Sequence, residues 1–340
     1  MHVVVLGAGG LGCVIGGRLA EVGADVTLIA RPAHVEAIER DGLRIGGIRG
    51  DTVVRDGVRA RTDARDVDEP VDYLILLTKT RDTATALASA DGLRDRVATA
   101  LSLQNSVTKD VLLVDWIGDR AIGATTTEAG TIVGPGVVRH NATAPTSFYF
   151  GELDGTVSPR VKDLAELFSS AGMGAQATPD IRQAEWEKLL QISIVSGFAA
   201  STLGYREPGA FAYGIAVRPG AEHYVAMAKE LIAVYTGMGY EPRDFFAPFS
   251  QFRVLASSSF DDAVDATLAL GTSMVENGIL GRPSLHEDIV RGRPTEVDDS
   301  LGAYLAEADR QGIAAPTARG AYRVIKALEA LAAESGSASA

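Results

Sequence analysis

The sequence predicts an α/β fold, with an N-terminal doubly wound sheet of the Rossmann type followed by a mostly helical C-terminal domain. Three observations predict it. Strand-like and helix-like segments alternate over the first half, the strands are continuously apolar, and helical patterns dominate after Pro179. Continuously apolar strands are typical of a parallel sheet that is covered on both faces. We therefore expect two domains, 1–179 and 180–333, and a flexible tail at 334–340.

The elements of the first half follow in chain order. Residues 2–6 are apolar and β-branched, which predicts a strand, and the helix that follows ends at Gly23. The turn at Gly134-Pro135-Gly136 predicts added strands on either side, some of them antiparallel. The expected elements are helix 11–22, strand 25–30, helix 33–41, β-structure 43–54, strand 72–78, helix 84–90, strand 97–103, strands within 121–151 and helix 161–171.

The second half reads as a series of helices. Asp180 and Gln183 form a capping box ahead of a long apolar run. Ser284 and Glu287 form another, and Glu296 falls in a first helical turn, where a carboxylate favours the helix dipole. The expected helices are 180–195, 219–237, 258–277, 284–290 and 295–311.

Composition and charge exclude several classes of protein. The 340 residues carry 32 Lys and Arg against 44 Asp and Glu, a net charge of −12, which argues against nucleic acid as a partner. The single Cys13 excludes a disulfide framework, and the five His lack metal-ligand spacing, so we expect no metal. There is no long apolar run and no signal peptide, so we expect a cytoplasmic protein without a membrane partner. The apolar helices permit a homodimer without requiring one.

A glycine-rich turn follows the first strand and opens the first helix. Gly7, Gly9 and Gly12 give the pattern G-x-G-x-x-G in the context that dinucleotide binding requires. Gly7 allows the tight turn, Gly9 lets a pyrophosphate approach the backbone, and Gly12 lets the helix pack close to the strand. The residues expected to bind the cofactor here are Gly7, Ala8, Gly9, Gly10, Leu11 and Gly12.

The residues at the end of the second strand indicate which dinucleotide the chain binds. An NAD site usually has Asp or Glu there to hold the ribose 2′-hydroxyl, but this strand runs Leu28-Ile29-Ala30-Arg31. The planar cation of Arg31 suits a 2′-phosphate. The absence of a carboxylate also argues against FAD, so we expect NADPH/NADP+ as the cofactor of the 1–179 domain.

One lysine, Lys188, lies within the apolar run that opens the second half. An ammonium group in poor solvent has a lowered pKa and can donate a proton near neutral pH. The alternative is a solvated lysine that pairs with Glu185 three residues earlier. The helix begins at the domain junction, where ligands of two-domain proteins tend to bind, and this favours the first interpretation.

Together these features resemble the ketopantoate reductase (2-dehydropantoate 2-reductase) family over nearly the whole chain. The matching segments are the glycine turn with Arg31, Leu77-Thr78-Lys79, Leu103-Gln104-Asn105, Gly134-Pro135-Gly136, Trp186-x-Lys188-Leu189, Ser284 to Asp288 and Thr295-Glu296-Val297-Asp298. The resemblance implies a reductase that transfers hydride from NADPH to the carbonyl carbon of a small-molecule 2-oxo acid.

The resemblance also implies roles for individual residues. Lys188 is similar to the general acid that protonates the carbonyl oxygen, and Glu296 to the carboxylate that orients this lysine or accepts a substrate hydroxyl, and that also lies at the cofactor. Ser284 is similar to a substrate hydrogen-bond donor. Asn105 is similar to a residue that contacts nicotinamide and substrate, and Lys79 to a lysine that contacts the cofactor.

The chain departs from the family pattern at four positions. Ile192 and Ser196 stand where the family has substrate-binding asparagines, Gly281 replaces a third asparagine, and Ser106 replaces a glycine. Because polar groups of this kind discriminate strongly between substrates, their loss predicts a substrate that is less polar or bulkier than ketopantoate.

Two alternatives remain open at this point. One is a related oxidoreductase: an opine-type or 6-phosphogluconate-type dehydrogenase, or a ketone or imine reductase of secondary metabolism. The other is a protein that senses NADPH without catalysis, for which the replacements at Ile192 and Ser196 leave room.

Overall fold

The computed structural model describes residues 1–201, 209–248 and 250–337. The chain divides into two compact units, Met1–Glu185 and Trp186–Ala340. Helix α6 (Ile181–Ser201) contains the point of division, whereas the boundary near Pro179 expected from the sequence lies just ahead of this helix. The α/β fold class is confirmed: a sheet organises the first unit, and helices make up the second.

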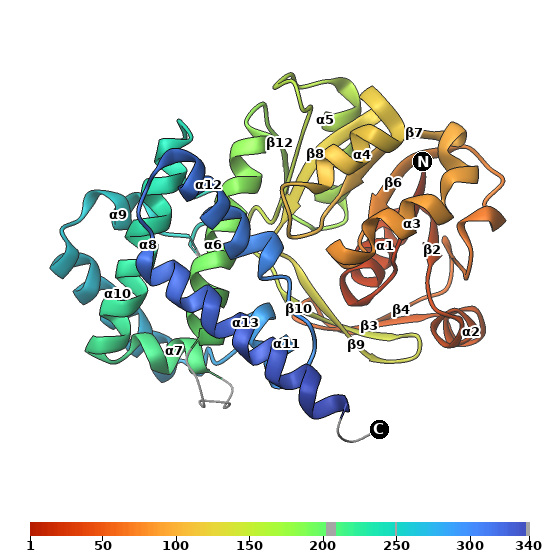
Figure 1. The fold of residues 1–340 in the computed structure, drawn as a ribbon. Coiled ribbons are helices and arrows are strands. Elements are labelled where there is room, and N and C mark those ends of the chain that lie inside the picture. The colour runs from red at the N-terminus through yellow and green to blue at the C-terminus, as the bar shows by residue number, and fades with distance from the viewer. Residues whose placement is uncertain (202–208, 249, 338–340) are drawn as a thin grey trace. The chain divides into compact units, whose positions relative to one another are not determined.

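An eight-stranded sheet forms the centre of the first unit (Figure 1). Its strand order is β12-β11-β8-β7-β6-β1-β2-β5, and all neighbours are parallel except β8 and β11. The strands are β1 (His2–Leu6), β2 (Asp25–Ile29), β5 (Val58–Arg61), β6 (Val71–Leu76), β7 (Val97–Ser102), β8 (Ala121–Thr126), β11 (Phe148–Gly151) and β12 (Ala175–Ala177). The antiparallel addition within 121–151 confirms the expectation from the sequence.

The register of the sheet brings four chain segments to one edge. Leu6 at the end of β1 pairs with Ile29 of β2 on one side and with Leu76 of β6 on the other, and Leu76 pairs with Ser102 of β7. The segments that follow these four strands therefore emerge side by side. The carboxyl edge of a parallel sheet is where such folds bind ligands.

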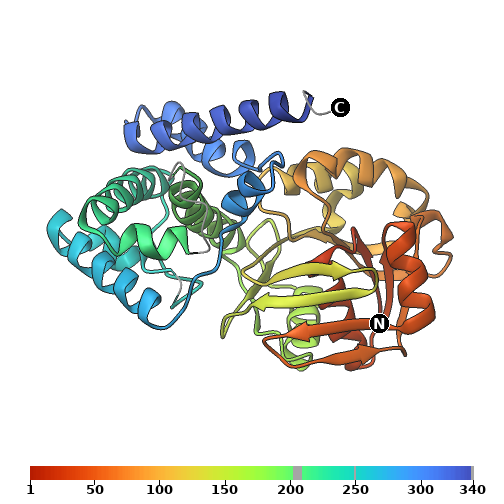
Figure 2. The ribbon, with the colours of Figure 1, turned by 90° about the horizontal axis from the view of Figure 1, so that it is seen from below.

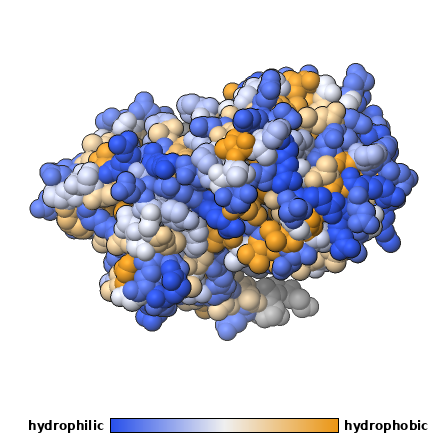
Figure 3. Space-filling model, turned by 90° about the horizontal axis from the view of Figure 1, so that it is seen from above, coloured by the Kyte–Doolittle hydropathy of each residue, from blue (hydrophilic) through white to orange (hydrophobic). Residues whose placement is uncertain are grey.

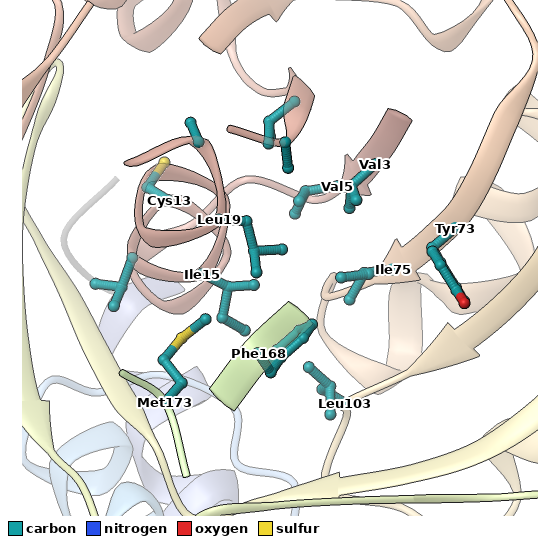
Figure 4. Close-up of a cluster of buried hydrophobic side chains, with 14 of the residues drawn as sticks. Val3, Val5, Cys13, Ile15, Leu19, Tyr73, Ile75, Leu103, Phe168 and Met173 are labelled. Atoms are coloured by element: carbon teal, nitrogen blue, oxygen red, sulfur yellow. The ribbon is translucent and has the colours of Figure 1, made fainter. Parts of the chain in front are cut away.

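Both faces of the sheet are buried, as the continuously apolar strands predicted. Val3 and Val5 of β1 belong to one hydrophobic cluster, and the alternate Val4 and Leu6 belong to another. Figure 4 shows the first cluster, in which Ile15 and Phe168 pack beside the strands. These clusters hold the sheet rigid beneath the carboxyl-edge loops.

Five helices and four 3₁₀ turns complete the connections of the first unit. The helices are α1 (Gly10–Glu21), α2 (Pro32–Asp41), α3 (Thr83–Ser89), α4 (Lys109–Ile117) and α5 (Pro159–Ser170), and the turns are η1 (Ala64–Asp66), η2 (Thr80–Asp82), η3 (Asp91–Arg96) and η4 (Gly118–Arg120).

A second, four-stranded sheet packs against α1 (Figure 2). Its order is β4-β3-β10-β9, with strands β3 (Leu43–Gly47), β4 (Thr52–Val54), β9 (Ala129–Gly134) and β10 (Val137–Ala142). Helix α1 contacts β2 of the large sheet and β9 of the small one. At Gly10 and Gly130 the two backbones nearly touch, because a Cβ on Gly10 would lie 2.3 Å from the Gly130 carbonyl oxygen. The start of α1 is therefore fixed by neighbours from both sheets.

The second unit contains α6 from Trp186 onward and the helices that follow it. These are α7 (Ala210–Ile215), α8 (Arg218–Gly237), α9 (Phe252–Ser257), α10 (Phe260–Glu276), α11 (Ser284–Val290), the π-helical turn η5 (Asp298–Gly302), α12 (Ala303–Gln311) and α13 (Pro316–Ser337). Helix α13 was not expected from the sequence. It extends to Ser337, into the segment 334–340 that the sequence suggested was a flexible tail. Residues 338–340 lie outside the described residues.

Two sequence expectations in this unit are wrong. The helix expected at 295–311 begins only at Asp298, so Glu296 precedes it in a bend. The capping box of Ser284 and Glu287 does not form, because Pro283 occupies the N-cap position and has no side-chain hydrogen bond to offer. The Glu287 carboxylate instead pairs with Arg282 and Arg291.

The surface shows no extended apolar region on the face drawn in Figure 3, where hydrophobic residues occur in several separate places among hydrophilic ones. None of the described helices is long and apolar enough to cross a bilayer. Within the same residues, no cluster of His, Cys, Asp and Glu is arranged to hold a metal ion.

Candidate functional site

The glycine turn after β1 has the geometry that the sequence predicted for Gly7. Its φ is 99°, a conformation that side-chain-bearing residues rarely adopt. A Cβ at this position would also lie 2.6 Å from the backbone nitrogen of Thr78. The N–H groups of Gly7 and Ala8 both donate to the Ile29 carbonyl, at 3.3 and 2.8 Å. These contacts tie the turn to the ends of β2 and β6.

Gly9 and Gly12 differ in their surroundings. A Cβ on Gly12 would lie 2.9 Å from the Gly7 carbonyl oxygen and 3.0 Å from Val5, so this glycine permits close helix–strand packing. A Cβ on Gly9 would meet only the Gly7 oxygen, at 4.0 Å, so the approach to Gly9 is open. Gly9 is the N-cap residue of α1. Because glycine has no side chain, it cannot cap the N–H groups of the first helical turn.

The first turn of α1 is suited to an anion. In the described structure the N–H groups of Gly10, Leu11 and Gly12 have no hydrogen-bond acceptor, whereas that of Cys13 bonds to the Gly9 carbonyl. Free N–H groups at the positive end of a helix dipole bind phosphate oxygens. The residues present therefore fit the pyrophosphate of a dinucleotide.

Arg31 follows β2 and is the N-cap residue of α2. Its side chain is exposed, and among the described residues it makes no hydrogen bond or ion pair. A cation in this state is available for an anionic ligand. Its charge also acts on His34, whose pKa is lowered by burial and, to a smaller extent, by Arg31.

The loops after β6 and β7 are tied together by Gln104. Its side-chain nitrogen donates to the Thr78 carbonyl at 2.8 Å, and its oxygen accepts from Ser102 Oγ at 2.9 Å. Lys79, next to Thr78, is exposed, and Asn105, next to Gln104, is partly exposed. Asn105 makes no side-chain hydrogen bond with any described residue. Sequence reasoning did not assign Gln104 a role, although its place beside Asn105 was a usable signal.

Lys188 does not pair with Glu185. Glu185 Oε1 instead lies 2.5 Å from Lys109 Nζ and accepts a hydrogen bond from the Ala124 N–H at 3.0 Å. Among the described residues Lys188 makes no hydrogen bond or ion pair. The side chain is only partly exposed, and burial lowers its pKa to about 8. The interpretation as a solvated, ion-paired lysine is therefore wrong.

Ile192 and Ser196 lie one and two turns after Lys188 on α6, on the same helical face. Both side chains are buried, with 7% and 4% of their surface exposed. On the face of α6 that carries Lys188, the next turn presents the apolar Ile192, and the turn after it presents only the small hydroxyl of Ser196.

The segment that carries Glu296 packs along α6 within the second unit. Leu301 of η5 lies against Gly197, where a Cβ would be 3.4 Å from Leu301 Cδ2. Tyr304 of α12 donates a hydrogen bond to the Trp186 carbonyl at 2.8 Å. Glu296 itself is partly exposed, and its carbonyl accepts from Ser300. Ser284 is exposed at the start of α11, and no described contact joins it to Lys188.

Glu187 is a buried carboxylate that the sequence interpretation overlooked. Its side chain accepts hydrogen bonds from the Arg243 and Phe245 N–H groups, at 2.9 and 2.7 Å, and from the Tyr235 hydroxyl at 3.2 Å. Burial raises the pKa of Glu187, against the lowering effect of these hydrogen bonds. A second charge beside Lys188 in an otherwise apolar run was the available signal.

Comparison with protein families matches both halves of the chain. Residues 3–155 match the family model described as "Ketopantoate reductase PanE/ApbA", and residues 180–329 match "Ketopantoate reductase PanE/ApbA C terminal". A 2-dehydropantoate 2-reductase of Halobacterium salinarum is 30% identical over 322 residues, which cover 94% of this chain and 96% of that protein.

Other relatives match over part or all of their length. A 2-dehydropantoate 2-reductase of Pyrococcus horikoshii is 35% identical over 201 residues, which span 59% of this chain and 64% of that protein, just under two thirds of its length. A solved PanE/ApbA family ketopantoate reductase from Ralstonia eutropha has 27% identity and a TM-score of 0.76, and the match covers 98% of this chain and 99% of that one.

Proposed function

Since the chain belongs to the ketopantoate reductase family, we propose that it reduces a 2-oxo acid to the 2-hydroxy acid with NADPH as the hydride donor, and that Lys188 supplies the proton. The observation that carries this proposal is the state of Lys188. It is an ammonium group without an ion-pair partner among the described residues, with a pKa lowered to about 8.

Reduction of a carbonyl group to an alcohol requires a proton as well as a hydride, and Lys188 is the proposed source of that proton. The reduced nicotinamide, when bound, supplies a hydride to the carbonyl carbon. Charge then develops on the carbonyl oxygen, and Lys188 Nζ donates a proton to it. A donor with a pKa of about 8 is still protonated at pH 7, yet gives up its proton far more readily than an ordinary lysine. Glu296 orients the ammonium group or accepts a substrate hydroxyl, and Ser284 donates a hydrogen bond to the substrate.

The first unit supplies the cofactor site. The N–H groups at the start of α1 bind the pyrophosphate, and the open approach to Gly9 admits it. Arg31 binds the 2′-phosphate that distinguishes NADPH from NADH. Lys79 and Asn105, at the ends of neighbouring strands, contact the cofactor, and Asn105 also contacts the substrate.

The helical face after Lys188 indicates the kind of substrate. Ile192 offers no hydrogen bond, and Ser196 offers one short hydroxyl. We therefore propose a 2-oxo acid whose remaining substituent is less polar or bulkier than that of ketopantoate.

A panel of 2-oxo acids, with ketopantoate included, tests the proposal. The measurement is the loss of absorbance of NADPH, with wild-type protein and with Lys188→Met, and NADPH binding is titrated in parallel. We expect turnover with at least one apolar 2-oxo acid, a loss of about 10²–10⁴-fold in kcat for the variant, and unchanged NADPH affinity. Binding of NADPH without oxidation by any carbonyl would instead identify a sensor. Turnover that requires an added amine would identify an opine-type enzyme.

A further inference from the structure

The Glu187 carboxylate occupies a pocket made of backbone groups. The side chain is completely buried, and its two oxygens accept from residues on either side of Asp244. Asp244 has a φ of 55°, the one positive value outside glycine in the described chain. This left-handed residue turns the N–H groups of Arg243 and Phe245 toward a common point, an arrangement that binds anions.

The strained residue is itself held in place. Asp244 Oδ1 accepts from the Phe252 N–H at 2.6 Å, at the start of α9. A non-glycine residue persists at positive φ only where its surroundings impose it. The loop 243–245 is therefore a preformed anion pocket, and the anion that fills it comes from α6.

The residue before Glu187 is anchored as well. The Trp186 ring packs edge-on against Tyr304, with centroids 5.3 Å apart, and the Tyr304 hydroxyl bonds to the Trp186 carbonyl. Two consecutive residues of α6 are thus fixed to different parts of the second unit, immediately ahead of Lys188. Together they restrict both the rotation and the sliding of this turn of helix.

We propose that Glu187 is a positioning residue for Lys188: by filling the 243–245 pocket, its carboxylate fixes the rotation of α6 so that the adjacent ammonium group keeps its direction and its partly dry surroundings. This inference rests on the proposed role of Lys188 as proton donor. Glu187 makes no contact with the reacting atoms and acts only through the helix.

Glu187→Gln tests the inference, because an amide has one acceptor oxygen and would turn its NH₂ group toward an N–H donor. We expect kcat to fall on the order of 10–100-fold, while the affinity for NADPH stays the same. The alkaline limb of the kcat–pH profile should also move from about 8 toward the ordinary lysine value of about 10.4, as Lys188 becomes better solvated.

Glu230→Gln is the matched control. Its half-buried carboxylate also accepts from two backbone N–H groups, those of Thr317 and Ala318 at 3.0 and 2.9 Å, but at the start of α13. We expect a lower melting temperature with unchanged kcat and pH profile. If Glu187→Gln behaves in the same way, the carboxylate is only structural and the inference is wrong.

Two further variants keep the outcomes distinct. Should Glu187→Gln not fold, Tyr235→Phe removes a single donor to the same carboxylate, and we expect a smaller shift of kcat and of the pH limb in the same directions. No shift of either quantity would overturn the inference. If Lys188→Met keeps its kcat, the proposed proton donor itself is wrong, whatever Glu187 does.

Discussion

Glu185 and Lys109 form a buried ion pair, with Oε1 and Nζ 2.5 Å apart, so the carboxylate three residues before Lys188 is engaged by another lysine. Both side chains are almost completely inaccessible to solvent, at 4% and 1%. Asp110 joins the pair through Lys109 at 3.0 Å. Two carboxylates therefore share one ammonium group, and burial, together with Asp110, raises the pKa of Glu185.

Removal of Lys109 should destabilise the first unit strongly. Lys109→Met leaves two buried carboxylates without a cation, so we expect the free energy of unfolding to fall by about 3–5 kcal/mol at pH 7. Because the folded pKa of Glu185 lies above its unfolded value, the stability it contributes is present at low pH and is lost as pH rises. The deficit should therefore shrink toward pH 5 in denaturant titrations. Lys326→Met, which breaks partly exposed pairs to Asp298 and Glu329, should cost less than about 1 kcal/mol.

The pH dependence of catalysis should change sign with the direction of the reaction. In the proposed mechanism, reduction uses the protonated form of Lys188, so kcat should decline as pH rises through about 8. Oxidation of the 2-hydroxy acid needs the neutral amine, so its kcat should increase over the same interval. Steady-state profiles in both directions measure this. Lys188→Arg carries a cation that does not titrate, so any remaining activity should lose the alkaline limb; a limb that persists would belong to another group.

Arg31 should set the preference for NADPH. For Arg31→Met we expect an NADPH dissociation constant about 10–100-fold higher, as for a lost charge-assisted hydrogen bond, with NADH binding nearly unchanged. Fluorescence titration of both nucleotides gives the ratio. Arg40→Met, on the same helix but paired with Asp41, should leave both affinities as they are. Equal weakening of NADPH and NADH by Arg31→Met would contradict the 2′-phosphate assignment.

Alanine substitutions at Gly9 and Gly7 should have different effects, the first on NADPH binding and the second on stability. Gly9→Ala adds a methyl group where the nearest atom is 4.0 Å away, so the melting temperature should hold while NADPH binding weakens. Gly7→Ala combines a φ of 99° with a Cβ 2.6 Å from Thr78 and should cost at least about 1–3 kcal/mol of stability. Gly23→Ala has a similar φ of 91° in open space and isolates the backbone strain. Tight NADPH binding by Gly9→Ala would place the pyrophosphate elsewhere.

The first half of the fold was predictable because local patterns coincide with tertiary structure there. The apolar run of β1 and the glycines after it dictate a buried strand and a tight turn without help from distant residues. The second half was less predictable. The sequence interpretation missed α13 and began the helix after Thr295 too early, since packing on neighbouring helices decides where such segments start and end.

The candidate site divides in the same way. The sequence alone predicted the tight turn at Gly7 and proposed Arg31 as a ligand of the 2′-phosphate, because both predictions depend on local chemistry. The pocket for Glu187 could not be predicted, because it depends on the left-handed Asp244, far along the chain, and no short-range pattern connects the two. The capping box at Ser284 matched its motif and still does not form, because the N-cap residue of α11 is Pro283, and the Glu287 carboxylate pairs with Arg282 and Arg291.

The backbone contact between Gly10 and Gly130 has a consequence for engineering a change of coenzyme. Any side chain at either position would push β9 away from the first turn of α1, and the amide groups proposed to bind the diphosphate would move with it. The exposed Arg31 has no such constraint. A designer who wishes to exchange one nicotinamide coenzyme for the other should therefore vary the connection between β2 and α2 and keep both glycines fixed.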